Sequence, residues 1–243
     1  MKLIGNIIVV FGTLVATASA NAAAVNVVTD NTVPAMAASV LPVPVLGSNM
    51  VGMEATVTFS DGSTDTGSWG PTGATSGVAF GAGGFFVVGT ANDTFTSTWV
   101  LDNLNSLTIT RLTFNGVPGN TVFDIIPGAT LTPDSSLGFS FVDLTNLPGT
   151  IDVTYSNPVG IGAAAPLNDL YATMDIDFSG LQAGGVTPGT GYDFQQDTDM
   201  VQDLRVPPPQ VPLPATLPLA IAAFVGLGAV SYTHLRAHET MLH

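Results

Sequence analysis

The chain contains no cysteine and very few basic residues. Four lysine and arginine residues stand against eighteen aspartate and glutamate residues, and the formal net charge is −14 at pH 7. Without cysteine there is no disulfide framework, so apolar packing and backbone hydrogen bonds must stabilise the fold. A surface this acidic repels the phosphates of nucleic acids and of anionic lipids, which excludes nucleic-acid binding as a function.

Side chains for nucleophilic catalysis are also scarce. Lys2 is the only lysine, and all the histidines lie at the C-terminal end, from His234 onwards. The long central part of the chain therefore cannot form Ser-His-Asp, Cys-His or Ser-Lys arrangements, or a zinc site with histidine ligands. Because only carboxylates are left there for acid–base chemistry, we expect a protein that is not an enzyme.

One short motif matches a catalytic loop. Asp65-Thr66-Gly67-Ser68 has the Asp-Thr-Gly-Ser pattern of aspartic proteases, but the sequence holds no second copy. Those enzymes need two aspartates that share a proton, so we interpret the motif as a turn exposed to solvent. A glycan hydrolase built from two aspartates is a third, less favoured alternative for the function.

The central region has the pattern of an all-β protein. Ala55, Val57 and Phe59 alternate with threonines, which is typical of a half-buried strand. Similar segments recur at roughly 8–12-residue spacing between Pro-Gly and Asn-Gly pairs. We expect an antiparallel, jelly-roll-like β-sandwich over residues 23–202, with residues 31–53 as an edge strand plus a loop. The other predicted strands are Gly77–Phe80, Gly84–Gly89, Thr94–Leu101, Ser106–Phe114, Thr121–Ile125, Leu137–Leu144, Thr150–Tyr155, Tyr171–Phe178 and Gly191–Gln195.

The N-terminal segment has the layout of a secretory signal peptide. Lys2 is followed by the apolar stretch Leu3–Val15 and by small residues. Cleavage fits Ala18-Ser19-Ala20 and, equally well, Ala20-Asn21-Ala22. We therefore expect residues 1–22 to be a signal helix that directs export through the Sec translocon.

The C-terminal region carries a second apolar segment. The pentapeptide Val211-Pro212-Leu213-Pro214-Ala215 precedes Leu217–Val230, which has no charged residue. That run is shorter than the roughly 20 residues of a membrane-spanning helix, and the prolines favour an extended, accessible chain before it. The segment 211–230 resembles the VPLPA variant of the PEP-CTERM sorting signal.

A sortase site is the alternative for the same residues. Leu213-Pro214-Ala215-Thr216 matches the start of an LPxTG motif, but Leu217 stands where that motif requires glycine. There is also no polar spacer before the apolar run. The PEP-CTERM resemblance is therefore preferred.

The resemblance implies a route and a location. It implies processing by an exosortase in a Gram-negative bacterium, with the C-terminal helix as a transient anchor in the inner membrane. The final location would be the cell surface or the extracellular matrix, and the role a structural one tied to exopolysaccharide or biofilm. Residues 203–210, which include Pro207-Pro208-Pro209, would form a stiff spacer.

The last residues resemble something other than protein-coding sequence. Residues 230–240, VSYTHLRAHET, are similar to one translated frame of a sequencing adapter. We therefore expect residues 231–243 to be a non-native tail that is not part of the fold. The spacing of His234 and His238, which suits a metal pair on a helix, then carries no function.

Calcium is the cofactor that the composition suits best, because Ca²⁺ prefers carboxylate and carbonyl oxygens. Asp197 and Asp199, with Asp193 and the more distant Asp169, could converge at one edge of the sandwich. Their spacing does not match an EF-hand, and solvated turn aspartates with no cofactor are the alternative. A calcium-dependent module that binds extracellular polysaccharide is accordingly the second function considered.

Overall fold

The computed structural model describes residues 22–206 except residues 43, 126–130 and 136. The chain divides after Val206 into two units, and only the first contains described residues. Residues 1–21 of the predicted signal helix, with Ala18 and Ala20, therefore lie outside the described residues, as do the sorting segment 211–230 and the tail. Ala22 is described, and it is exposed and belongs to no helix or strand. Within them, no helix is long and apolar enough to cross a membrane.

The described residues form fifteen strands and a single short turn of 3-10 helix, which confirms the all-β prediction. In chain order these are β1 (Ala24–Asp30), β2 (Ala35–Ala37), β3 (Ser39–Leu41), β4 (Glu54–Phe59), β5 (Thr64–Pro71), β6 (Ser76–Phe80), β7 (Phe86–Ala91), β8 (Trp99–Asn103), β9 (Ile109–Asn115), η1 (Val117–Gly119), β10 (Thr121–Asp124), β11 (Val142–Asp143), β12 (Thr150–Ile161), β13 (Leu170–Asp177), β14 (Gly191–Gln195) and β15 (Asp197–Gln202).

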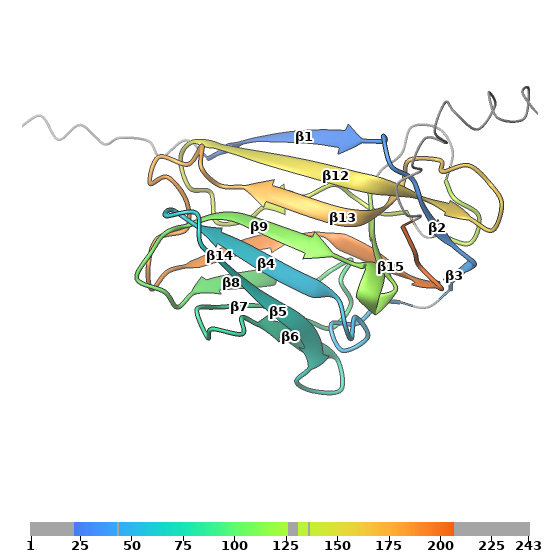
Figure 1. The fold of residues 1–243 in the computed structure, drawn as a ribbon, viewed down its shortest axis with the longest axis horizontal. Coiled ribbons are helices and arrows are strands. Elements are labelled where there is room, and N and C mark those ends of the chain that lie inside the picture. The colour runs from blue at the N-terminus through green and yellow to red at the C-terminus, as the bar shows by residue number, and fades with distance from the viewer. Residues whose placement is uncertain (1–21, 43, 126–130, 136, 207–243) are drawn as a thin grey trace, which may run out of the picture. The chain divides into compact units, whose positions relative to one another are not determined.

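The strands join into one curled and mainly antiparallel sheet (Figure 1). Its order is β11-β14-β8-β7-β6-β5-β4-β9-β13-β10-β15-β3, and β12 pairs with β13. Only β1 and β2 are parallel to their common neighbour β12. The curl leaves both halves of the sheet packed on one hydrophobic core.

The sheet changes direction at β5. Residues Thr64–Ser68 of this strand pair with β4, whereas Trp69–Pro71 pair with β6. Gly67 lies at the change, and a Cβ there would stand 2.1 Å from the carbonyl oxygen of Phe80. A glycine is therefore needed for the two strands to approach each other so closely.

This arrangement corrects the interpretation of the Asp-Thr-Gly-Ser motif. Asp65–Ser68 lies inside β5 rather than in a solvated turn, and Asp65 is buried. Its carboxylate accepts hydrogen bonds from the backbone N–H groups of Gly83 (2.9 Å) and Phe85 (3.3 Å). The prediction was wrong because it rested on the polar residues that surround Asp65 in the sequence. The backbone N–H groups that satisfy the Asp65 carboxylate lie about twenty residues further along the chain, where local sequence gives no sign of them.

Aromatic side chains fill the centre of the core. The rings of Trp69 and Trp99 have centroids 5.2 Å apart, and Trp99 also stacks on Phe194 at 5.8 Å. Both indole N–H groups donate to backbone carbonyls, of Gly47 at 2.7 Å and of Gln196 at 3.0 Å. These bonds tie the core to the segment that contains Gly47 and to the junction between β14 and β15.

Candidate functional site: an acidic pocket

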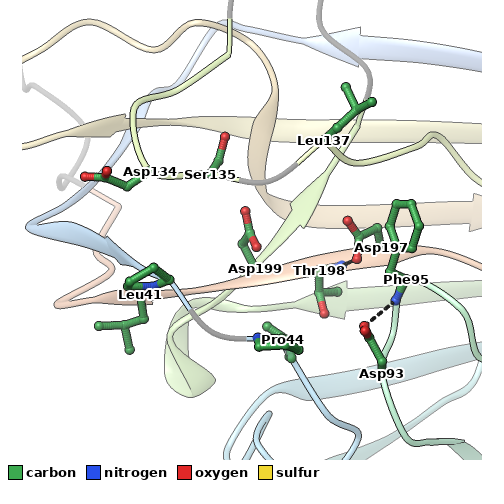
Figure 2. Close-up of a pocket in the computed structure, with 12 residues that line it drawn as sticks. Leu41, Pro44, Asp93, Phe95, Asp134, Ser135, Leu137, Asp197, Thr198 and Asp199 are labelled. Atoms are coloured by element: carbon green, nitrogen blue, oxygen red, sulfur yellow. Dashed lines mark hydrogen bonds between the residues drawn. The ribbon is translucent and has the colours of Figure 1, made fainter.

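A pocket of about 470 Å³ opens beside β15 (Figure 2). Four of its lining residues are aspartates, which come from the segment after β7, from the loop before β11 and from β15. The wall is otherwise largely apolar, with Phe95 at its edge. The lining residues are Leu41, Pro42, Pro44, Val45, Asp93, Phe95, Asp134, Ser135, Leu137, Asp197, Thr198 and Asp199.

Strand register brings three carboxyl groups to one face of the sheet. Asp197 and Asp199 alternate along β15 with Thr198, so their side chains point to the same side. Asp124 at the end of β10 lies directly opposite Asp197 in the antiparallel pair. Opposite residues share a face and have Cβ atoms roughly 4.5–5.5 Å apart. We call Asp124, Asp197 and Asp199 the carboxylate cluster.

Asp124 is fully buried, and neither of its carboxylate oxygens has a hydrogen-bond partner among the described residues. The backbone of Gly138 packs onto it, since a Cβ on Gly138 would stand 2.3 Å from the Asp124 Cγ. Burial raises the pKa of Asp124 to about 9, and the negative charges of neighbouring aspartates add to the shift. These neighbours are, in order of effect, Asp199, Asp197 and Asp169.

Asp197 has one satisfied oxygen and one orphan. Its Oδ1 accepts hydrogen bonds from the N–H of Thr198 (2.9 Å) and the hydroxyl of Thr94 (3.4 Å). Its Oδ2 is buried without a hydrogen-bond partner among the described residues. Burial, and then the charge of Asp199, raises the pKa of Asp197 to about 7. The two donors oppose this shift, as does hydrogen bonding to any carboxylate.

Asp169 has a different role from the cluster. Its carboxylate accepts hydrogen bonds from the N–H of Thr132 (2.5 Å) and from its hydroxyl (2.6 Å), and the Ser135 hydroxyl lies 3.5 Å away. Charge-assisted hydrogen bonds of this kind are strong. Asp169 therefore anchors the loop whose residues Asp134, Ser135 and Leu137 form one wall of the pocket.

The sequence named four calcium candidates, and the structure gathers three of them. Asp197 and Asp199 line the pocket, and Asp169 lies close enough to act on the charge of Asp124. Asp193 lies apart on β14, where it is exposed and pairs with Val100 of β8.

Sequence reasoning missed Asp93, Asp124 and Asp134. The signal for Asp124 was present, because it is the single charged residue in the apolar stretch Thr121–Ile125. A charged side chain in a strand that is buried on both faces indicates either a hydrogen-bonding or ionic partner in the fold or a functional role.

The cluster does not by itself complete a metal-binding shell. Among the described residues, no three acidic side chains converge closely enough to hold an ion on their own. The basic side chain of Arg111 lies elsewhere, where it pairs with Asp175 and Asp177, each at 3.2 Å. The pocket is thus an acidic hollow with an apolar rim and an exposed aromatic ring.

Comparison of the chain with known proteins gave no relative. No family model, no curated protein and no solved structure matches it.

Proposed function

We propose that the protein is an exported, exosortase-processed protein of the cell surface or extracellular matrix, and that its β-domain binds rather than catalyses. The observation that carries this is the pentapeptide Val211–Ala215, followed by the uncharged run Leu217–Val230. It begins five residues after Val206, where the first unit ends. The signal-peptide pattern of residues 1–22 supports the same route.

In this proposal the Sec translocon and an exosortase are partners during export. The C-terminal helix is the chain's only contact with the membrane, and it is transient. The mature protein then acts in the exopolysaccharide or biofilm matrix of a Gram-negative bacterium. The acidic composition suits such a solvated setting and disfavours anionic lipid surfaces.

For the fold, we propose a jelly-roll-like β-sandwich as the finer description of the curled sheet. Support comes from the shared core, which takes buried side chains from strands on both sides of β5. Val57 and Leu112 come from one side, and Val88 and Leu101 come from the other. Sandwiches of this kind serve widely as secreted binding modules.

The sorting proposal is tested by following the full chain in a host with an exosortase and in the same host with that gene deleted. An antibody to the β-domain should detect a shortened, released form in the first host and a membrane-bound form in the second. Pro214→Ala should block processing because it alters the pentapeptide, and Thr216→Ser is the matched control outside it. Release that is equal in both hosts would overturn the proposal.

A second candidate function is calcium-dependent binding of polysaccharide. It is favoured by Phe95, which is 46% exposed and lies at the edge of a pocket lined by four aspartates. An exposed ring offers a flat apolar face to a sugar, while carboxylates accept hydrogen bonds from the hydroxyl groups of the sugar. Retention of the chain on the host's exopolysaccharide, lost in chelator and weakened by Phe95→Ala, would support this function. Retention unaffected by either change would exclude it.

A further inference from the structure

We propose that the facing carboxyl groups of Asp124 and Asp197, two members of the carboxylate cluster, bind a calcium ion beside the acidic pocket. The inference goes beyond the sorting route and does not depend on it. It deepens the second candidate function, because it names the residues that bind the calcium ion. Calcium binding does not depend on that function, whereas a role of the ion in binding polysaccharide does.

The first argument is placement. Asp124 and Asp197 are directly opposite on β10 and β15, and Asp199 is two residues further along the same face. Cross-strand carboxyl groups at this spacing can reach one ion at oxygen distances of roughly 2.3–2.6 Å. Backbone hydrogen bonds hold β10 and β15 together, so the site is built on rigid strands rather than on a loop.

The second argument is independent of clustering. Asp124 is fully buried, and both of its oxygens lack a hydrogen-bond partner among the described residues. Asp197 lines the pocket, and its Oδ2 atom is also buried without a hydrogen-bond partner among the described residues. Buried polar groups in folded proteins are almost always satisfied, and an orphan carboxylate calls for a proton, a water or an ion. Three orphan oxygens from two facing residues point to one shared ligand.

The donor chemistry selects calcium. The cluster offers only oxygen atoms, and the chain has no cysteine and no histidine before residue 234. Oxygen ligands suit hard cations, and Ca²⁺ accepts a flexible shell of six to eight that includes carbonyls and waters. Because no three acidic side chains among the described residues are placed to hold one ion, backbone carbonyls, hydroxyls and water entering from the pocket must complete the shell around the two carboxylates.

Asp169 is a positioning residue rather than a ligand of the proposed ion. Both oxygens of Asp169 are engaged by Thr132, so this carboxylate holds the loop rather than the ion. The same loop returns over Asp124 at Gly138. An ion on Asp124 would therefore fix the part of the loop that walls the pocket, which links occupancy of the site to the shape of the pocket.

The test is calorimetric titration of the full chain, stripped with a chelator, with calcium chloride and separately with magnesium chloride. Wild-type protein should bind calcium with a dissociation constant on the order of 10⁻⁴–10⁻³ M, as extracellular modules do, and its thermal midpoint should rise. Asp124→Asn and Asp197→Asn should each weaken calcium binding by about tenfold or more, because each removes a charged ligand. Magnesium should bind more weakly than calcium.

Asp193→Asn is the matched control, since this aspartate is exposed on β14 and away from the cluster. It should bind calcium within about twofold of wild type. Absence of calcium binding by wild-type protein, or unchanged binding by a folded Asp124→Asn or Asp197→Asn variant, would overturn the proposal. Equal affinity for magnesium would overturn the assignment to calcium. The wild-type titration decides by itself if neither variant folds.

Discussion

Asp124 on β10 and Asp197 on β15 lie directly opposite each other in an antiparallel pair, and both carboxyl groups are buried. Two carboxyl groups this close in an apolar surrounding do not both ionise without a counter-charge. Burial, reinforced by neighbouring negative charge, accordingly raises the pKa of Asp124 to about 9 and that of Asp197 to about 7. Protons would therefore compete with any cation that binds these oxygens.

This relationship predicts how stability depends on pH once metal is removed. In chelator, the unfolding free energy of wild-type protein should fall as pH rises from about 4 to about 9. The pKa of Asp124 is about 9 in the folded protein and ordinarily 3.8, so the folded form holds a proton that the unfolded chain releases. The resulting stabilisation is complete below the unfolded pKa and is lost as pH rises through the folded pKa.

Urea unfolding at a series of pH values measures this effect. Asp124→Asn has no proton to lose at this position, so its stability should change less with pH than that of wild type. Asp193→Asn should keep the wild-type slope, since Asp193 is exposed. Parallel profiles for wild type and Asp124→Asn would show that Asp124 does not retain its proton in the folded chain.

A second prediction concerns the loop that covers Asp124. Gly138→Ala should destabilise the protein by about 1–3 kcal/mol, because its Cβ would overlap its neighbours. That atom would stand 2.3 Å from Cγ and 2.6 Å from the backbone carbon of Asp124, so rotation of the carboxyl group cannot relieve the contact. Gly70→Ala in β5 is the control, since nothing lies within 4 Å of a Cβ there. Equal denaturation midpoints for the two variants would contradict the close approach.

The loop anchor makes a third prediction. Asp169→Ala removes the acceptor for both the N–H and the hydroxyl of Thr132, and should cost about 1.5–3 kcal/mol per hydrogen bond to the charged group. Amide hydrogen exchange should rise first in the segment around Thr132 and Ser135, while the core strand β9 stays protected. Thr132→Val keeps the N–H donor and should show a smaller rise. Uniform loss of protection throughout the sheet would indicate a global effect instead.

Local patterns in the sequence correctly predicted the strands in which apolar and polar residues alternate, or in which a long apolar stretch is buried. Ala55, Val57 and Phe59 are buried in β4 as their alternation requires, and β12 and β13 also lie where strands were expected. In contrast, Leu137–Leu144 was predicted as one strand, and only Val142–Asp143 is in the sheet. Its first part is held by side chains of other segments: the Tyr155 hydroxyl accepts a hydrogen bond from the Phe141 N–H (2.9 Å), and the Gln196 amide donates one to the Phe139 carbonyl (3.4 Å). A period of two in the sequence does not encode such contacts.

Long-range pairing explains most of what the sequence did not reveal. β1 is parallel to β12, and Asn26 of β1 bonds to Asp152, 126 residues away. Asp193 and Asp197 are close in sequence, yet β14 and β15 belong to different parts of the sheet, beside β8 and β10. Closeness in the sequence was therefore a poor guide to which acidic residues share a site. The strand register that places Asp124 opposite Asp197 could be read only from the structure.

The last prediction concerns the wall of the pocket opposite the loop. The indole N–H of buried Trp69 donates to the carbonyl of Gly47 at 2.7 Å. The N–H of Gly47 in turn donates to the carbonyl of Asn92, at 2.9 Å, and Leu46 pairs with Asp93. Trp69 therefore anchors the segment of Val45 to Gly47 in the core, and backbone hydrogen bonds join that segment to the one that carries Asp93 into the pocket wall.

Trp69→Phe keeps an aromatic ring against Trp99 but leaves the Gly47 carbonyl without its indole donor. An acceptor deprived of its partner in a buried position costs about 1–3 kcal/mol, and the smaller ring adds a packing defect. Exchange of the amide of Gly47 should rise more than that of amides in β13, because the loss is local to the wall. Phe80→Leu, at a side chain that is 59% exposed, should change stability by no more than about 0.5 kcal/mol. If Trp69→Phe were as mild as this control, the indole bond to Gly47 would not be what anchors this segment, and the backbone bonds to Asn92 and Thr94 would hold the wall without it.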